Sequence, residues 1–307
     1  MKDDAATSKQ PPACVVRQRK TAFIDILRTT PPKTVCPNFY ILAHANGCAF
    51  SPRCSYCYLK GSLWHMDGDH VFSNVDQMVD EVSGWIAKDE LESYVLNSGN
   101  LSDSLAFEGV RALMARLIEL FRTEAEAKGR PHALLLVTKG GMKACRPLFD
   151  VAPCRNVLVS FSVNSRAAAR DHEQGAAAVE DRLEAARQLK AAGWRVRMRI
   201  DPMILGYDYA WIIQEVRRLA PERVTLGTLR AEPALIRLDT EGLFDKLERP
   251  ADPKGVARYP KADRIAVYRQ GVDALKSVCP VALCEETQDM WLALGLDVDG
   301  KPCNCGA

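Results

Sequence analysis

Two kinds of hydrophobic pattern alternate along this chain. Runs that are apolar almost throughout, such as 132–139 and 156–163, are typical of strands buried on both faces of a parallel sheet. Between such runs, apolar residues recur every three or four positions, as they do in amphipathic helices. This spacing predicts helices over 75–86, 110–121, 178–192 and 209–219. The apolar runs predict six strands, over 38–45, 92–99, 132–139, 156–163, 194–201 and 223–229.

Strands that alternate with helices in this way predict an α/β fold with a parallel sheet covered by helices. An open doubly wound sheet and a whole or partial barrel both satisfy the pattern. No linker interrupts residues 34–230, which we expect to form one domain. Residues 1–33 are polar and contain several prolines, so we expect an extended N-terminal arm. Residues 231–307 are expected to pack on the same domain as a C-terminal extension that carries cysteines.

Composition narrows the class of protein. The 307 residues are 47% hydrophobic and 26% charged, which excludes disordered, collagen-like and coiled-coil chains. No run of about 18 apolar residues occurs, so no membrane span is expected. The N-terminus lacks the apolar stretch of a secretory signal, which predicts a cytoplasmic protein. A net charge of +2 is too small to indicate tight nucleic-acid binding, so DNA is a disfavoured partner. The net charge does not exclude a local basic groove.

Eleven cysteines are unusual for a cytoplasmic chain. A disulfide framework is not expected in a reducing compartment. The cysteines also gather in two places, at 48–57 and at 279–305. Clustered thiols without disulfides indicate ligands for a soft metal or for an iron–sulfur cluster.

The first group, Cys48, Cys54 and Cys57, directly follows the first predicted strand. Three thiolates can hold three irons of a [4Fe–4S] cube and leave the fourth iron open. Sites in α/β folds form at the carboxyl ends of parallel strands, which is where this loop lies. The alternatives are a zinc site completed by His44 or His65, and cysteines that only pack in the core. The position after the first strand favours the iron–sulfur interpretation.

Five segments of this chain resemble the spore photoproduct lyase family of the radical S-adenosylmethionine (SAM) superfamily. They occur in the family's order over roughly residues 38–230, and together they are far more specific than any one alone. The superfamily fold that this resemblance implies is a partial (β/α)6 barrel, in agreement with the six predicted units. The segments are 54–59 (CSYCYL), 97–103 (NSGNLSD), 136–139 (LVTK), 161–164 (FSVN) and the helix–strand passage from 181 to 193.

The resemblance also implies cofactors and an activity. A [4Fe–4S] cluster on Cys48, Cys54 and Cys57 would bind SAM through its amino and carboxylate groups. Reduction by an external donor of the flavodoxin or ferredoxin type would cleave SAM to methionine and a 5′-deoxyadenosyl radical, which abstracts hydrogen from a substrate. The cofactor carries this chemistry, and the protein supplies orientation and exclusion of water.

Individual residues are assigned by their match to the family's motifs. Lys139 matches the lysine that meets the SAM carboxylate, and a fixed cation there can pair with an anion. The remaining matches are a SAM-contacting serine, two residues of the strand-two turn beside the methionine end of SAM, and two tyrosines of the radical relay. They are Ser162, then Ser98 and Asn100, then Tyr56 and Tyr58.

This chain departs from the family's pattern at two points. Five residues separate Cys48 and Cys54, where the family has three. The turn Asn97-Ser-Gly-Asn100 lacks the cysteine that returns a hydrogen atom to the product radical in the family's repair enzymes. We therefore expect an enzyme that abstracts hydrogen from a small molecule or peptide. A DNA-lesion lyase and a non-enzymatic zinc or iron–sulfur protein are the alternatives.

The second group of cysteines lies near the C-terminus. Cys284, Cys303 and Cys305, with Cys279 as a further candidate, are predicted to form a second metal site, preferably iron–sulfur, that faces the barrel mouth. The stretch 285–299 contains apolar residues at helical spacing, so it can fold back and bring the thiols together. Zinc, buried thiols and a hydrogen-donating pair of thiols are the alternatives.

The strand over 194–201 carries charge on one face only. Arg197 and Arg199 alternate with apolar neighbours, and Asp201 follows them. If this face lines the barrel, the two arginines can read an anionic substrate. If it does not, they form a solvated face.

Overall fold

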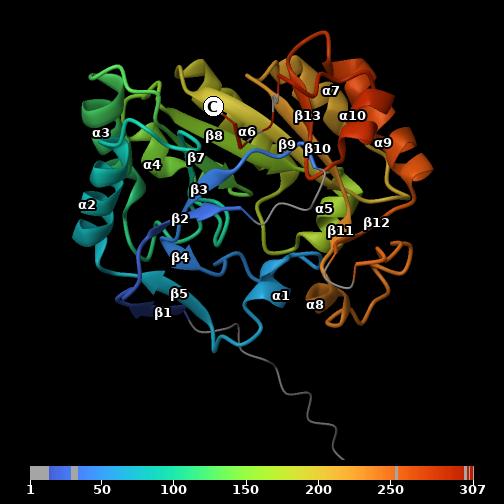
Figure 1. The fold of residues 1–307 in the computed structure, drawn as a ribbon, viewed down its shortest axis with the longest axis horizontal. Coiled ribbons are helices and arrows are strands. Elements are labelled where there is room, and N and C mark those ends of the chain that lie inside the picture. The colour runs from blue at the N-terminus through green and yellow to red at the C-terminus, as the bar shows by residue number, and fades with distance from the viewer. Residues whose placement is uncertain (1–13, 29–33, 253–254, 301–302, 304, 307) are drawn as a thin grey trace, which may run out of the picture.

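The computed structural model describes residues 14–28, 34–252, 255–300, 303, 305 and 306. Its centre is an eight-stranded sheet in the order β13-β10-β9-β8-β7-β6-β3-β2 (Figure 1). Its neighbouring strands are parallel except for the β2–β3 pair, which is antiparallel. The strands are β2 (Ile24–Leu27), β3 (Phe39–Leu42), β6 (Val95–Asn97), β7 (Ala133–Thr138), β8 (Val157–Val163), β9 (Arg195–Met203), β10 (Val224–Thr228) and β13 (Val281–Leu283).

All six predicted strands are present, as β3, β6, β7, β8, β9 and β10. The sequence pattern did not show β13, which adds a seventh parallel strand next to β10. No pairing between β2 and β13 is found within the described residues, so the sheet curls without closing. The predicted α/β fold with a partial barrel is confirmed.

Helices cover the outer face of this sheet (Figure 1). For example, α6 packs on β8 and β9, and α9 packs on β10. Gly193 follows the end of α6 with a φ of +98°, a backbone conformation that favours glycine. The covering helices are α2 (Val75–Ile86), α3 (Met114–Leu120) with its π-helical continuation η1 (Phe121–Glu126), α4 (Arg146–Phe149), α6 (Val179–Ala191), α7 (Ala210–Leu219), α9 (Lys261–Leu275) and α10 (Gln288–Ala293).

Shorter elements surround the open ends of the strands. A second sheet has the order β1-β5-β4, and a third is the pair β11–β12. These elements are β1 (Cys14–Arg17), β4 (Ala45–Asn46), β5 (Asp69–Phe72), β11 (Arg230–Ala231), β12 (Ala257–Arg258), α1 (Leu59–Ser62), α5 (Arg166–His172) and α8 (Pro233–Ile236).

Alternation along β9 decides which side chains reach the interior. Val196, Met198 and Ile200 join the large core between the sheet and its helices. Successive side chains of a strand point to opposite faces, so Arg197 and Arg199 lie on the inner face. Arg197 is fully buried, and Arg199 is only 15% exposed. The arginines therefore line the barrel rather than a solvated surface.

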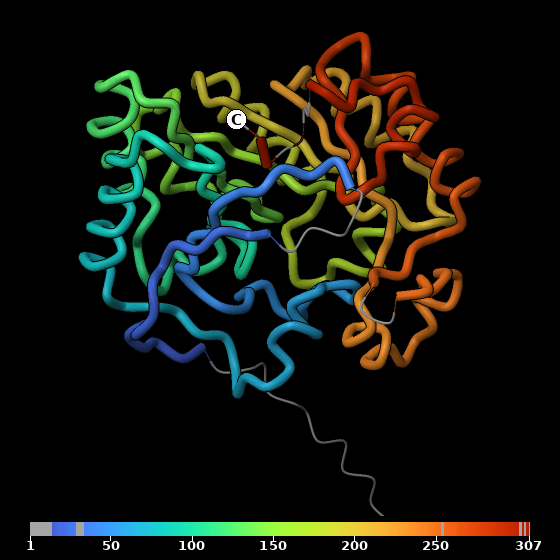
Figure 2. Tube along the Cα trace, in the orientation of Figure 1, coloured from blue at the N-terminus to red at the C-terminus, as the bar shows by residue number. Residues whose placement is uncertain are grey.

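Part of the predicted N-terminal arm belongs to the sheets. Within residues 14–28, β1 pairs in parallel with β5, and β2 pairs with β3. Further along, the backbone N–H of Val35 donates to the carbonyl oxygen of Glu286 at 2.9 Å, and Thr34 bridges to Thr287. Figure 2 shows this blue segment running beside the red chain that precedes α10. The two ends of the parallel sheet thus approach each other.

None of the helices in the described ranges combines the length and the apolar character that a membrane span needs.

Candidate cofactor site at the strand ends

The loop that carries Cys48, Cys54 and Cys57 connects β4 to α1 at the carboxyl end of the sheet. Asp69 of β5 fixes the first half of this loop. The Asp69 Oδ1 accepts a hydrogen bond from the backbone N–H of Cys48 at 3.2 Å and pairs with Arg53. Gly47 permits this contact, since a β-carbon there would lie 2.0 Å from the same oxygen. Asp69 therefore spans the five-residue gap that distinguishes this loop.

The second half of the loop is a tight turn. The N–H of Cys57 donates to the carbonyl oxygen of Cys54 at 3.0 Å, and α1 begins directly afterwards. All three thiols are half-buried. Burial raises the pKa of Cys54 to about 11, and Lys139 acts against this shift. Metal ligation would therefore release protons from these thiols.

His44 does not serve as a fourth metal ligand beside these cysteines. Its side chain is buried, and its Nε2 lies 3.1 Å from the carbonyl oxygen of Ser98. Its Nδ1 lies 3.1 Å from Arg111. Burial and then Arg111 lower its pKa to about 3, so the imidazole is neutral and holds the chain near β3.

Among the described residues, no three His, Cys, Asp or Glu side chains are grouped to bind one metal ion. In an iron–sulfur cube the thiolates bind separate irons. Three soft thiols on one loop are a donor set of the kind that such a cube takes.

A buried carboxylate, Glu173, organises the region beside this loop. It lies just after α5, and its side chain is inaccessible to solvent. Lys139 donates to it at 3.2 Å, and Arg182 of α6 donates at 2.5 Å. Asn164 donates to it at 3.1 Å, and the Tyr56 hydroxyl also donates to it. Residues that lie far apart in the sequence therefore meet at a single carboxyl group.

The charges of this group do not cancel. Lys139 and Arg182 carry two positive charges against the one negative charge of Glu173. Burial acts to raise the pKa of Glu173, but the two cations outweigh burial and hold it well below its usual range. The surplus positive charge lies close enough to Cys54 and Cys57 to interact with their thiols. It favours thiolates or a bound carboxylate at this place.

Lys139 also contacts Ser162, the other residue that was assigned to the SAM site on the inner face of the sheet. The Lys139 Nζ donates to the Ser162 Oγ at 2.9 Å and lies 5.7 Å from the centre of the Tyr56 ring. An ammonium group has three N–H donors, and Ser162 and Glu173 use two of them. One donor remains for a further anion.

The segment 97–103 is held against β7 by Asp103. Its carboxylate accepts from the backbone N–H of Lys139 at 2.7 Å and from the Thr138 hydroxyl at 2.9 Å. A β-carbon at Gly99 would lie 2.5 Å from that of Val137, so this position requires glycine. These two hydrogen bonds of Asp103 explain why the segment 97–103 ends in an acidic residue.

The other predicted residues of this turn differ in their contacts. The Ser98 hydroxyl is buried and bonds to the Ser104 hydroxyl at 2.8 Å and to the Leu135 carbonyl oxygen at 3.2 Å. Asn100 offers its backbone oxygen to the hydroxyl of Tyr58, which is 43% exposed. Tyr58 therefore joins the cysteine loop to the strand-two turn.

A second polar group lies on the inner face of β9 and β10. Asp201 accepts from Arg199 at 2.5 Å and from Arg230 at 2.8 Å, and Arg230 also pairs with Glu285 at 2.6 Å. Both guanidinium groups also reach the sulfur of Cys284, at 3.2 Å and 3.1 Å. Cys284 follows β13, so the structure places this predicted residue at the strand ends.

The remaining C-terminal cysteines separate into two locations. Cys303 is buried, and its thiol hydrogen-bonds to that of Cys305. This bond lowers the pKa of Cys303 and raises that of Cys305. Cys279 precedes β13 and packs in the outer core. It lies at the opposite end of that strand from Cys284, so the candidate role of Cys279 in the same site is not supported.

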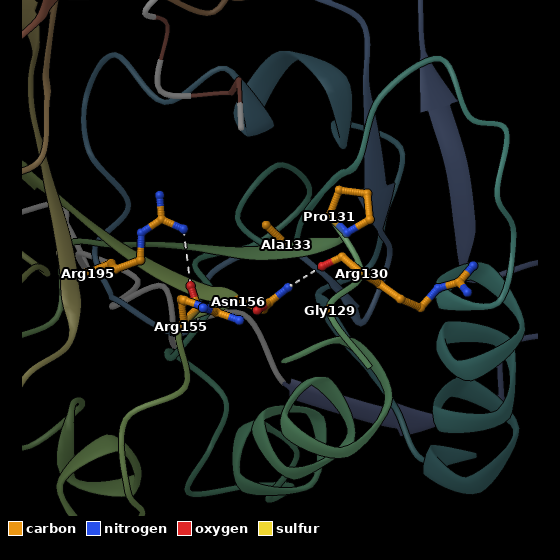
Figure 3. A pocket seen from close by; sticks show the side chains of 7 residues that line it. All are labelled: Gly129, Arg130, Pro131, Ala133, Arg155, Asn156 and Arg195. Carbon is orange, nitrogen blue, oxygen red and sulfur yellow. Dashed lines mark hydrogen bonds between the residues drawn. The ribbon is translucent and has the colours of Figure 1, made fainter. Parts of the chain in front are cut away.

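A hollow of about 240 Å³ lies at the opposite edge of the sheet, where the strands begin (Figure 3). Arg130, Arg155 and Arg195 are among its lining residues. Two of these arginines have partners already, because Arg195 pairs with Glu222 and Arg130 pairs with Asp89. This hollow is not part of the cofactor site.

The partial barrel with a three-cysteine loop at its strand ends matches the radical SAM class of enzymes that the sequence resembles. The sequence model described as spore photoproduct lyase matches residues 15–226, well over half of the chain. The chain therefore belongs to the spore photoproduct lyase family, and the resemblance is confirmed. Enzymes of this family use a [4Fe–4S] cluster and SAM.

The curated relatives that match this chain are also spore photoproduct lyases. The spore photoproduct lyase of Clostridium acetobutylicum is 22% identical over 207 residues, which are 67% of this chain and 59% of the relative. The enzyme of a Geobacillus species is 27% identical over 248 residues, 79% of this chain and 67% of the relative. The chain thus spans about three fifths of the length of the Clostridium enzyme.

Solved structures show the same fold. A spore photoproduct lyase complexed with dinucleoside spore photoproduct superposes with a TM-score of 0.71 at 20% identity. The match covers 90% of this chain and 82% of that chain. A substituted form with bound AdoMet and dinucleoside spore photoproduct gives a TM-score of 0.69 at 19% identity.

Sequence reasoning missed three charged residues of these groups. Glu173, just after α5, and Arg230, in β11, belong to no motif, and Arg182 of α6 lies in the family-like segment 181–193 without an assigned role. A charged residue in an apolar helix face was the available signal for Arg182, which lies between the buried residues Val179 and Leu183. Glu173 and Arg230 gave no local signal.

We predict that Glu173→Gln destabilises the protein by about 3–5 kcal/mol, because it leaves two buried cations without their counter-charge. Urea denaturation at pH 7 measures this loss. Glu180→Gln is the matched control, since Glu180 pairs with Arg166 at the surface and such pairs contribute about 0–1 kcal/mol.

The pH dependence has a definite sign. The folded-state pKa of Glu173 is depressed below 4.5, so its contribution is complete above about pH 4.5 and is lost as pH falls towards the folded-state pKa. The difference in the free energy of unfolding between wild type and Glu173→Gln should therefore become smaller only in acid. If Glu173→Gln lowers the free energy of unfolding at pH 7 by no more than Glu180→Gln does, the role of Glu173 is contradicted.

Proposed function

We propose that this chain is a radical SAM enzyme that cleaves SAM reductively and abstracts a hydrogen atom from a small molecule or peptide at the barrel mouth. The observation that carries this proposal is the juxtaposition of the three-cysteine loop with the positively charged group around Glu173. Family membership supplies the reaction class.

The residues present suit both cofactors. Cys48, Cys54 and Cys57 would hold a [4Fe–4S] cluster, because they are the soft donors at the strand ends. Lys139 would meet the SAM carboxylate with its third N–H donor. The bound pair supplies a 5′-deoxyadenosyl radical, and everything else depends on how the protein orients and shields it.

The surrounding side chains perform the positioning. Glu173 and Ser162 fix the direction of the Lys139 ammonium group, since they accept two of its three N–H donors. Asp103 fixes the backbone at Lys139 from the other side. Tyr58 closes the gap between the cysteine loop and Asn100. These contacts would limit the access of water to the radical.

Cleavage of spore photoproduct in DNA is the second candidate function. Family membership and the fold shared with lyases that bind a dinucleoside spore photoproduct favour it. The turn Asn97–Asn100 argues against it, because it holds no cysteine and its one buried hydroxyl, on Ser98, is already bonded twice.

The cluster assignment is tested by replacing Cys48, Cys54 and Cys57 together with Ala. We expect the reduced protein to lose release of 5′-deoxyadenosine from SAM completely, because no thiolates remain for the cluster. The same measurement on Cys14→Ala, which alters an exposed cysteine, should match wild type. Release at the normal rate from the triple variant would show the assignment to be wrong.

Lys139→Ala should weaken SAM binding by about 1.5–3 kcal/mol, because a charge-assisted hydrogen bond to the carboxylate is lost. Equilibrium dialysis against the reconstituted protein measures the affinity. Lys143→Ala is the control, since Lys143 is an exposed lysine of the same loop. Unchanged affinity in the Lys139 variant would place the carboxylate elsewhere.

Dinucleoside spore photoproduct distinguishes the two functions. With SAM and dithionite, we expect 5′-deoxyadenosine to form while the repaired dinucleotide does not accumulate, as followed by liquid chromatography. Accumulation of repaired dinucleotide in step with 5′-deoxyadenosine would establish the lesion lyase and reject the small-molecule or peptide substrate.

A further inference from the structure

Four cysteines outside the three-cysteine loop meet on the far side of the barrel mouth. They are Cys36, Cys284, Cys303 and Cys305, which we call the distal thiols. We propose that the distal thiols bind a second iron–sulfur cluster, a [4Fe–4S] cube, and that all four are its ligands. The sequence predicted a site on the last three of them, and the structure adds Cys36.

Backbone pairing brings Cys36 to this place. The N–H of Val35 donates to the carbonyl oxygen of Glu286 at 2.9 Å, so residues 34–36 run beside the turn that follows Cys284 (Figure 2). The Cys36 thiol lies against the backbone of Glu285 and interacts electrostatically with Cys303. Glu285 has a φ of +51°, which turns the chain sharply after Cys284. Cys36 and Cys284 thus flank one turn.

Two arginines bind the backbone of the residues near the C-terminus. Arg197 donates to the carbonyl oxygen of Gly306 at 2.7 Å, and Arg223 donates to that of Cys303 at 2.7 Å. Cys303 is only 3% exposed, and its thiol contacts that of Cys305. Cys305 in turn interacts with Cys284. Three segments distant in sequence therefore supply four neighbouring thiols.

The charged side chains around the distal thiols suit bound thiolates. Arg199 and Arg230 each direct an N–H at the Cys284 sulfur, at 3.2 Å and 3.1 Å. Arg199 also interacts with Cys303 and Cys305. Hydrogen bonds to sulfur are a principal means by which proteins stabilise iron–sulfur clusters and set their potentials. Neutral thiols that merely pack would not need two guanidinium donors.

The other cysteines do not share this environment. Cys145, Cys154 and Cys279 lie in the apolar core, and Cys14 is exposed. Two of the distal thiols, Cys303 and Cys305, also pack against this core. What sets them apart is that their thiols contact each other and interact with Arg199. Cys279 lies in the same region of sequence as Cys284, which makes it a matched control.

Four thiolate ligands define the chemistry of the cluster. Ligation would release the four thiol protons and leave no iron open to substrate. This differs from the open three-cysteine site that the sequence alone predicted. A closed cluster exchanges electrons rather than binding substrate, so the distal site would be an electron-transfer centre.

Iron and sulfide counting after anaerobic reconstitution tests the site without any use of SAM or activity. Wild type should hold about eight irons per chain, and the variant with Ala at positions 48, 54 and 57 should hold about four. Adding Cys36→Ala and Cys284→Ala together to that variant leaves two of the four thiolates, so the count should fall well below four. Adding Cys279→Ala and Cys284→Ala instead leaves three thiolates, which still hold a cube, so the count should stay at about four.

Two results would overturn the proposal. Essentially no iron in the variant at positions 48, 54 and 57, or stoichiometric zinc in its place, would reject an iron–sulfur cluster. Retention of four irons after Cys36→Ala with Cys284→Ala, or their loss after Cys279→Ala with Cys284→Ala, would reject four-thiolate ligation. If the variant at positions 48, 54 and 57 fails to fold by circular dichroism, the same two pairs of substitutions in wild type decide, with about four irons expected for Cys36→Ala with Cys284→Ala and about eight for Cys279→Ala with Cys284→Ala. Loss of the proposed SAM cleavage would leave these counts unchanged, so the two proposals fail separately.

Discussion

One buried carboxylate determines how the cofactor site is built. Glu173 accepts hydrogen bonds from the cysteine loop through Tyr56, from the end of β7 through Lys139, from the end of β8 through Asn164 and from α6 through Arg182. A carboxylate removed from water is stable only with such partners. The cost of burying Glu173 is therefore offset only when these four elements are in register, which fixes the cysteine loop relative to the strand ends.

Two charged groups line the same sheet, and they differ in their balance. Around Glu173 two cations face one anion, whereas Arg199 and Arg230 face the two anions Asp201 and Glu285. The first group attracts a further anion, which suits a SAM carboxylate and thiolates. The second group is electrically neutral, yet its guanidinium N–H groups still have Cys284 to donate to. The two sides of the barrel therefore differ in net charge. The side around Glu173 is positive, and the side around Cys284 is neutral and binds the sulfur by hydrogen bonds.

The sequence predicted the strands well because their buried runs are continuous. It failed for β13, whose three residues Val281–Leu283 are too short to show a period, and for β2, an antiparallel edge strand inside a polar segment. Lys139 was assigned by its match to the family's motif at the end of a predicted strand. Glu173 was not, because its partners lie 9 to 117 positions away along the chain. Cys36 was missed for the same reason, since an isolated cysteine has no spacing that reveals its neighbours.

The strand-two turn has a fixed backbone but lacks the thiol of the family's repair enzymes. Asp103 and Gly99 hold this turn against β7, so its backbone is as fixed as in a site built for catalysis. The turn itself offers no thiol, and Cys284, whose sulfur accepts from Arg199 on the inner face of the sheet, follows β13 at the other end of the parallel strands from β3. The cofactor side of the site therefore carries the cysteine loop and Lys139 of the family's motifs, whereas the turn beside it lacks the cysteine of the family's repair enzymes, and this one difference is what favours the proposed small-molecule or peptide substrate over a lesion in DNA.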